Sequence, residues 1–367
     1  MLWVDKYRPK TLAEADLLPE PTNALKTLAG TKDMPHLLVY GPPGGGKRTR
    51  VMGLLAQQFG PSVYNVKLDH KSVQVTESKA IEVTTLSSPH HIDINPSDAG
   101  NYDRVIVMQM IREIASTVPL VTNSNGLSGN SKGAGGTSQP AKPPFKVIVM
   151  NEVDKLSRGA QQALRRTMEK YIETCRIILV CSSASRLIQP LRSRCLSIRV
   201  PLHDEASVAK VARHICEKEN ITPAPSDAFC TSLFVRSEGN LRRAILMLES
   251  AKMNRADFNG SGDDIPMPDW KFYVTEIASN ITTEQTPRML FEIRGKFYEL
   301  LGQCIPGDMV LRELVLSLLA LAPASARRDI LAAAAQFDVN MKLGSKPIMH
   351  LEAFAAASMK AIKMVRL

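Results

Sequence analysis

The sequence has no apolar stretch near the roughly 20 residues that a membrane-spanning helix needs, which argues against a transmembrane protein. Its first residues, MLWVDKYRPK, carry Asp5, Lys6 and Arg8 where a secretory signal would have an apolar block, so we expect a protein that stays inside the cell. The six cysteines show neither CxxC nor Cys/His ligand spacing. We therefore predict free, buried thiols in preference to zinc ligands or disulfides.

Composition is ordinary for a soluble globular protein, with 44% apolar and 22% charged residues, and the 367 residues predict two or three domains of about 150 residues. The net charge of +10 permits a polyanionic partner. Positive charge is concentrated between Lys142 and Arg199, where twelve basic side chains accompany four acidic ones. On composition alone, this segment fits a solvated surface as well as a face that binds nucleic-acid phosphates.

The first half alternates short β-rich runs with amphipathic helical stretches, which is typical of an α/β fold with a parallel sheet. Strands are predicted at 36–40 (HLLVY), 146–150 (KVIVM) and 176–181 (RIILVC). Helices are predicted after Lys47, over 103–117 and over 157–171. In the last of these, Leu164 and Met168 share one face and Ser157 is placed to cap the N-terminus.

Residues 122–144 are rich in glycine and proline and almost lack apolar side chains, so they cannot bury enough surface to order themselves. We interpret them as a flexible loop inserted between a helix and a strand of the first domain. Deleting this loop should leave folding intact.

After Pro201 the strand signals stop. The pattern predicts helices over 206–219 and 240–253, followed by a polar linker over 259–268. From Trp270 onward helices dominate. One helix face carries Leu290, Ile293, Phe297 and Leu301, and another carries Leu311, Leu314, Leu318 and Leu321. The predicted domains are 1–200, 201–262 and 269–367.

The strand at 36–40 runs into a glycine-rich loop that matches the GxxxxGK pattern of a phosphate-binding loop. The loop consists of Gly41, Pro42, Pro43, Gly44, Gly45, Gly46 and Lys47. Glycines let successive backbone N–H groups converge on phosphate oxygens at a helix N-terminus, and Lys47 adds a cation that reaches the outer phosphates. We predict a site that binds ATP or ADP, with a simple glycine-rich turn as the alternative.

Two positions that should hold magnesium are altered. A hydroxyl should follow the lysine, but Arg48 stands there, and Thr49 comes about 100° further round the helix. Where a P-loop ATPase places an Asp-Glu pair after its apolar strand, this sequence has Asn151 and Glu152. An amide lacks the anionic charge that orients the metal, and Glu152 without a well-held metal should not restore turnover. We therefore name no metal ligand and predict a site that binds nucleotide but hydrolyses it slowly or not at all.

Five segments, taken in order, carry a resemblance to a known family. They are 2–9 (LWVDKYRP), 41–47 (GPPGGGK), 163–169 (ALRRTME), 193–195 (SRC) and 239–243 (GNLRR). The chain resembles the small subunits of replication factor C, which are AAA+ ATPases that load sliding clamps onto DNA. It is most similar to the type called three in animals and five in budding yeast. The resemblance implies a P-loop AAA+ parallel-sheet domain, a small helical lid domain and an all-α collar domain for oligomerisation.

The resemblance also implies roles for residues around the nucleotide. Those lying against the adenine base would be Val4, Tyr7, Arg8 and Pro9. The loop from Gly41 to Thr49 would wrap the phosphates. Ser182 stands where the family has a first sensor asparagine, and its shorter hydroxyl again weakens the case for hydrolysis. The second sensor is Arg242, or with less support Arg243.

Arg194 carries the most specific implication. In the family, the arginine between Ser and Cys projects across the subunit interface and completes the neighbour's ATP site. Such an arginine finger contributes about 10³ to 10⁵ in rate. Without the family, Arg194 would be interpreted as a surface arginine before a strand.

The family tracks the backbone of duplex DNA through helix N-termini and basic side chains. The candidates for this contact are Arg104, Arg112, Lys155 and Arg158. Phosphate contacts carry no sequence information, so binding should follow DNA structure and weaken with salt. Arg165 and Arg166 are assigned either to DNA or to an interface between adjacent subunits.

The implied partners are the other replication factor C subunits of a hetero-pentamer, a sliding clamp and primer-template DNA. Alternative large subunits of checkpoint or cohesion clamp loaders are further candidate partners. The resemblance implies no membrane partner and a location in the nucleus. Two alternatives remain: a competent DNA-stimulated ATPase subunit that uses Thr49, Glu152 and a rearranged metal shell, and a stand-alone P-loop phosphotransferase.

Overall fold

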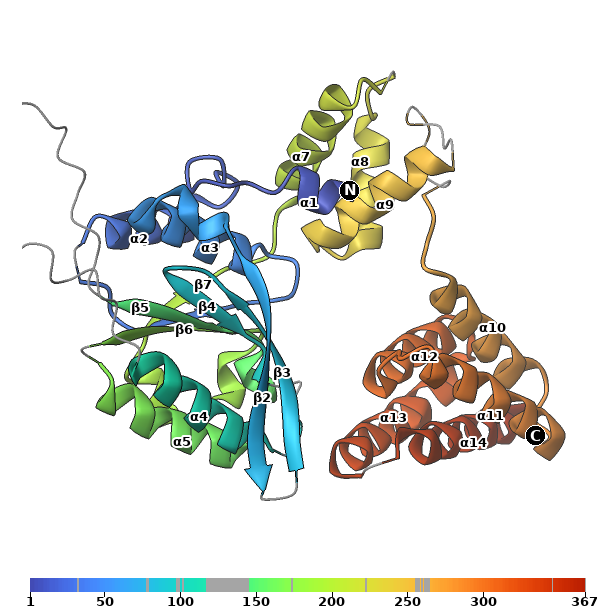
Figure 1. Cartoon of the computed structure of the whole chain (residues 1–367). Helices are drawn as coiled ribbons and strands as arrows, with labels where there is room; N and C mark the ends of the chain where they lie inside the picture. The colour runs from blue at the N-terminus through green and yellow to red at the C-terminus, as the bar shows by residue number, and fades with distance from the viewer. Residues whose placement is uncertain are drawn as a thin grey trace, which may run out of the picture. The chain divides into compact units, whose positions relative to one another are not determined.

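The protein is described from a computed structural model. The structure describes residues 1–31, 33–76, 79–96, 100, 102–116, 145–172, 174–221, 223–254, 258, 260, 265–344 and 346–366. The chain divides into two compact units, Met1–Ile265 and Pro266–Leu367 (Figure 1). The predicted loop at 122–144 and half of the predicted linker at 259–268, namely 259 and 261–264, lie outside the described residues.

A seven-stranded sheet lies at the centre of the first unit, in the order β2-β3-β4-β5-β6-β1-β7. The strands are β1 (Leu37–Tyr40), β2 (Lys67–Thr76), β3 (Lys79–Ser87), β4 (His91–Ile94), β5 (Lys146–Met150), β6 (Cys175–Cys181) and β7 (Leu196–Arg199). Strands β4, β5, β6, β1 and β7 are parallel, whereas β2 and β3 are antiparallel and extend the sheet at one edge. The carboxyl ends of the parallel strands therefore open on the same side, where α/β sheets bind their ligands.

Helices cover both faces of this sheet (Figure 1). One face carries α2 (Pro19–Ala29) and α3 (Lys47–Phe59), and the other carries α4 (Asp103–Ser116) and α5 (Arg158–Lys170). Because successive strand residues point to opposite faces, Leu37 and Val39 belong to the core beneath α2 and α3. Leu38 belongs to the core beneath α4 and α5. The short helix α6 (Gln189–Arg192) precedes β7.

Three helices follow the sheet and form a lid. They are α7 (Glu205–Lys218), α8 (Asp227–Ser237) and α9 (Leu241–Met253). Ser226 and Asn240 cap α8 and α9 by accepting hydrogen bonds from backbone N–H groups three residues later. The N-terminal helix α1 (Trp3–Lys6) packs on α9, with Trp3 buried. The first residues of the chain are thus part of the lid.

The second unit is all-helical. It contains α10 (Asp269–Thr283), α11 (Pro287–Gly302), α12 (Gly307–Leu321), α13 (Ala324–Leu343) and α14 (Pro347–Arg366). Of the predicted apolar faces, Ile293, Phe297, Leu311, Leu314 and Leu318 are buried, and Leu290 and Leu301 pack partly buried against them. Leu321, the last residue of α12, is 50% exposed.

The predicted fold class is confirmed, and the predicted strands and helices agree with the structure to within a residue or so. Ser157 caps α5 as predicted, since its Oγ accepts a hydrogen bond of 3.2 Å from the amide of Ala160. The sequence analysis missed one feature of the sheet and was wrong about one cysteine. The antiparallel pair β2–β3 was not predicted, and Cys304 is exposed after the end of α11, whereas the other five cysteines are buried free thiols. Among the described residues, none of the helices has the length and apolar character needed to cross a membrane.

Candidate functional site

The phosphate loop follows β1 and ends at the first residue of α3, Lys47. Gly44 and Gly46 adopt φ angles of 78° and 81°, which favour glycine because a Cβ is strained there. A Cβ on Gly44 would also lie 1.7 Å from Oδ1 of Asn240, the residue that caps α9, so the loop and the lid meet at this glycine. The sequence therefore requires glycine here for backbone conformation and for close contact with the lid.

Lys47 bends back over its own loop. Its Nζ donates hydrogen bonds to the carbonyls of Gly41 and Pro42, at 2.6 and 2.9 Å. Burial lowers the pKa of the Lys47 ammonium, and the nearby positive charge of Arg242 adds to this effect. Two cations, one from the loop and one from α9 of the lid, thus converge where a polyphosphate would relieve their mutual repulsion.

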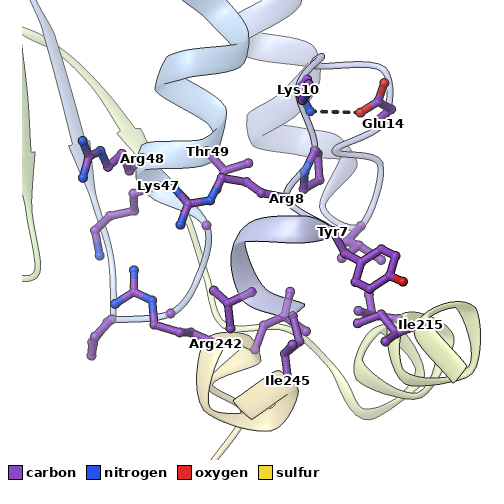
Figure 2. A pocket seen from close by; sticks show the side chains of 18 of the residues that line it. Tyr7, Arg8, Lys10, Glu14, Lys47, Arg48, Thr49, Ile215, Arg242 and Ile245 are labelled. Atoms are coloured by element: carbon purple, nitrogen blue, oxygen red, sulfur yellow. Dashed lines mark hydrogen bonds between the residues drawn. The ribbon is translucent and has the colours of Figure 1, made fainter. Parts of the chain in front are cut away.

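A cavity of about 1260 Å³ lies beside the loop, between the carboxyl ends of the strands and the lid. Figure 2 shows side chains from the N-terminal arm, the start of α3 and the lid helices around it. Predicted nucleotide-binding residues that line it are Val4, Tyr7, Arg8, Pro9, Pro43, Gly44, Gly46, Lys47, Arg48, Thr49, Asn151, Ser182 and Arg242, and the predicted catalytic residue Glu152 lines it as well. Gly41, Pro42 and Gly45 belong to the loop without lining the cavity.

The arm end of the cavity is tied to the lid through an acidic residue that the sequence analysis missed. Glu219, which follows α7, accepts hydrogen bonds of 2.6 Å from both Lys6 Nζ and Tyr7 Oη. These two bonds hold the pKa of Glu219 down to about 2. The buried carboxylate of Glu249 accepts a bond of 3.1 Å from the Trp3 amide. The arm is thereby held against α7 and α9, whose Val211, Ile215 and Ile245 give this end of the cavity apolar walls.

The phosphate end holds a second acidic residue that the sequence analysis missed. Asp93, on β4, accepts a hydrogen bond of 2.6 Å from Nη2 of Arg48 and another from the side-chain amide of Asn151. Only 5% of its side chain is exposed. Burial raises the pKa of Asp93, and the Arg48 guanidinium opposes that rise.

These residues do not fit a divalent cation. A guanidinium occupies the position of the expected hydroxyl ligand, and the carboxylate beside it already accepts from two side chains.

Glu152 follows β5 with φ of 53°, a left-handed conformation that is rare for a side chain with a Cβ. Its carboxylate pairs with Lys155 at 2.7 Å. Ser182, at the end of β6, donates a hydrogen bond to Asp154. Lys155, a candidate for DNA contact, therefore lies at this cavity beside Glu152.

Arg194 does not line the cavity. Its Nε donates to Oε1 of Glu169 on α5 at 2.6 Å, and its Nη1 donates to the carbonyl of Pro190 at 2.8 Å. The Arg194 guanidinium is the largest cause that lowers the pKa of Glu169, and Arg165 makes a longer contact of 3.4 Å with the same oxygen. Arg194 is about one-third exposed, so it is oriented by its own chain while remaining accessible to a second molecule.

A smaller cavity of about 240 Å³ lies between α4 and α5. Its basic lining residues are Arg104, Arg112, Arg166 and Lys170. Two of these were predicted to contact DNA, Arg166 was left between DNA and a subunit interface, and Lys170 was missed. Arg158, the remaining candidate, is the first residue of α5.

We call this cavity between α4 and α5 the basic groove. One buried side chain, Asp103, joins its two helices. Asp103, the first residue of α4, accepts bonds of 2.7 and 3.0 Å from the amide and hydroxyl of Ser157, the N-cap of α5. It also accepts a bond of 2.6 Å from the Arg104 amide. Asp103 is only 3% exposed, so this carboxylate fixes the starts of α4 and α5 relative to each other.

Three family models match consecutive parts of the chain. Residues 37–202 match the ATPase family associated with various cellular activities (AAA), 210–253 match the RCF1/5-like AAA+ ATPase lid domain, and 270–366 match the C-terminal domain of replication factor C subunit 3.

Curated relatives match over the full length. Replication factor C subunit 5 of Oryza sativa subsp. japonica is 44% identical, covering 99% of this chain and 98% of that protein. Subunit 3 of Homo sapiens is 41% identical over 99% of this chain and 96% of that protein. Subunit 5 of Saccharomyces cerevisiae is 38% identical over 98% of both. A solved RuvB chain of Thermotoga maritima has TM-score 0.46 and 15% identity, covering 86% of this chain and 90% of that chain.

Proposed function

Because this chain belongs to the replication factor C subunit 3/5 family, whose members are AAA+ ATPases of the clamp-loader class, we propose that it acts as a nucleotide-binding, non-hydrolysing subunit. In this proposal the chain holds ATP or ADP in its large cavity and lends Arg194 to the ATP site of an adjacent subunit. Its second unit serves as the collar of a hetero-pentamer, which loads a sliding clamp onto primer-template DNA in the nucleus.

The convergence of Lys47 and Arg242 above a left-handed glycine loop is the observation that carries nucleotide binding. Backbone N–H groups at the start of α3 and two cations favour a polyphosphate. At the other end, the arm offers Tyr7 and Pro9, and the lid offers Ile215 and Ile245, as a partly apolar pocket for a flat base. The cavity of about 1260 Å³ therefore has room for the phosphates of one nucleotide at the loop end and for its base at the arm end.

Weak hydrolysis is supported by the surroundings of the three positions that should act on water or metal. The side-chain amide of Asn151 donates a hydrogen bond to Asp93, and the carboxylate of Glu152 forms an ion pair with Lys155. The hydroxyl of Ser182 donates a hydrogen bond to Asp154. A general base is useful only when it can reach the attacking water. None of these contacts favours that role.

The arginine-finger proposal is supported by the way Arg194 is held. Glu169 and the carbonyl of Pro190 fix two of its nitrogens, and the side chain stays partly exposed outside its own cavity. A guanidinium that is oriented before assembly loses less conformational freedom on meeting a phosphate than a mobile one.

Binding of DNA phosphates is supported by the basic groove between α4 and α5. Arg104 and Arg112 lie two turns apart on α4, and Arg166 and Lys170 lie one turn apart on α5, so each helix presents a basic face to the same cavity. Phosphate binding by such a groove is insensitive to base sequence and weakens with salt.

The test uses the assembled complex with a substitution in this chain alone. We expect Lys47→Ala to abolish nucleotide binding by this chain while total ATPase activity stays nearly unchanged. A large drop in total ATPase with intact assembly would favour the competent-ATPase alternative.

Arg194→Ala should leave nucleotide binding by this chain unchanged and reduce hydrolysis at the adjacent site by about 10³-fold or more. The matched control is Arg192→Ala, which removes an exposed arginine two residues away. Equal ATPase rates for the Arg194→Ala and Arg192→Ala complexes would eliminate the finger.

A further inference from the structure

Asp93 is a buried carboxylate at the phosphate end of the cavity, and its partners come from both positions at which a P-loop ATPase holds magnesium. Arg48 follows the loop lysine, and Asn151 follows β5. One carboxylate oxygen accepts from Arg48 at 2.6 Å, and the other accepts from Asn151. A carboxylate that is only 5% exposed needs such partners, because burial without them is costly.

The backbone fixes this cluster in place. β4 and β5 are parallel neighbours in which Asp93 pairs with Val149. The backbone N–H of Asn151 donates a hydrogen bond of 3.0 Å to the carbonyl of Ile94. The carboxylate that a P-loop ATPase usually places after β5 is therefore supplied here by Asp93 of the neighbouring strand β4. That acid holds a cation that belongs to the chain itself.

Arg48 is suited to face a phosphate from this position. It lines the cavity, 46% of its side chain is exposed, and Asp93 engages one terminal nitrogen. A guanidinium has five N–H donors in a planar fork that matches two phosphate oxygens. It keeps its charge at every physiological pH.

We propose that Arg48, anchored by Asp93 and Asn151, stands in for the divalent cation, so that this chain binds a nucleoside diphosphate or triphosphate without magnesium. The inference rests on the proposed nucleotide binding. It adds that the resident cation, and not a diffusible one, meets the phosphates beside Lys47.

The experiment measures ADP binding to the full chain by calorimetry, with magnesium and with EDTA. For the wild type we expect the Kd to change by less than about threefold between the two conditions. Arg48→Thr, which places a hydroxyl after Lys47, should bind at least about tenfold more weakly in EDTA and regain affinity with magnesium. The matched control is Arg288→Thr, the same change at an exposed arginine of the second unit, which should behave as the wild type.

Asp93→Asn tests the anchor. It keeps the shape of the side chain but removes the charge that holds Arg48, so ADP binding in EDTA should weaken several-fold while magnesium gives little recovery. Thermal melting checks that this buried substitution leaves the first unit folded. Since Arg48 is partly exposed, Arg48→Thr keeps the proposal testable if Asp93→Asn does not fold.

Three results would overturn the proposal. One is a loss of tenfold or more in wild-type ADP affinity on EDTA treatment. Another is that Arg48→Thr binds ADP in EDTA as tightly as the wild type does. The third is that the wild type binds ADP neither with magnesium nor with EDTA, or that Lys47→Ala binds ADP as tightly as the wild type does. Only this third result would refute the proposed nucleotide site as well.

Discussion

Replacing Asp103 by alanine should loosen the basic groove by detaching the start of α5 from the start of α4. The carboxylate accepts three hydrogen bonds, two from Ser157 and one from the Arg104 amide, and it is only 3% exposed. With the acceptor gone, the Ser157 amide and hydroxyl must find water or another partner. Since Arg104 is the second residue of α4 and Arg158 is the first residue of α5, the substitution changes the position of cations without removing any.

The magnitude follows from the bonds lost. A buried donor left without its acceptor costs about 1–3 kcal/mol, and some of this is recovered because both helix starts can reach water, so we expect a total of about 3 kcal/mol. That corresponds to roughly a hundredfold more frequent opening of the first turn of α5. Asp103→Asn keeps one acceptor oxygen and should show an intermediate effect.

Hydrogen exchange of the Ser157 amide and of the first turn of α5 measures this opening. The matched control is Asp227→Ala, which removes another first-turn acid at the start of a helix, but one that is 90% exposed. We expect faster exchange in Asp103→Ala and unchanged exchange at α5 in Asp227→Ala. Unchanged protection of α5 in Asp103→Ala would refute the anchoring role.

DNA binding by the assembled complex separates anchoring from simple electrostatics. Removing a negative charge beside a basic groove would by itself tighten binding to phosphates, whereas loss of the anchor should weaken it. Asp103→Ala should therefore bind duplex DNA more weakly with the same salt dependence, while Arg112→Ala should lower the slope of log K against log salt by about one. Tighter binding by Asp103→Ala would contradict the argument from geometry.

Three further predictions follow. Glu169→Gln in this chain should lower the ATPase activity of the assembled complex several-fold, which is a much smaller loss than that expected for Arg194→Ala. The reason is that the Arg194 side chain remains but loses its charged partner. An ATPase rate equal to that of the wild type would contradict this. Burial lowers the pKa of His203 to about 4, so the unfolded state binds more protons than the folded state between about pH 6.5 and 4. On acidification from pH 7 to 5, the free energy of unfolding of the wild type should therefore fall by about 2 kcal/mol more than that of His203→Leu. Equal losses of the two proteins in denaturant titrations would refute this. Phe297→Ala should cost the second unit about 3–5 kcal/mol and leave ADP binding by the first unit intact, as melting and calorimetry would show.

Local patterns explain why most of the fold and much of the cavity could be predicted. The glycine loop, the apolar strand β5 and the amphipathic helix α5 each carry their signal within a dozen or so residues. The arm residues Val4, Tyr7, Arg8 and Pro9 were placed only through the family resemblance, and they do line the cavity. The strands β2 and β3 were missed because, among the side chains of the pair that the structure describes, only Val73 and Val83 are buried in the main core, which leaves a weak alternating pattern.

The acidic partners could not be predicted, because none of them belongs to a motif. Asp93 lies 45 residues from Arg48, Asp103 lies 54 residues from Ser157, and Glu219 lies 213 residues from Lys6. A single acidic residue in a sequence looks like any solvated side chain. Its role becomes visible only when the fold brings a distant donor to it.

The burial of these acids separates two kinds of cation in the first unit. Glu169 and Glu152 have about half of their side chains exposed, so water can replace Arg194 or Lys155 when a phosphate draws that cation away. Asp93 is 5% exposed and cannot be resolvated in the same way. Arg48 should therefore keep its carboxylate partner when nucleotide binds, and only its remaining donors should turn to the phosphates. An exchangeable pair suits a finger that must change partners on assembly, whereas a fixed pair suits a resident cation that must stay.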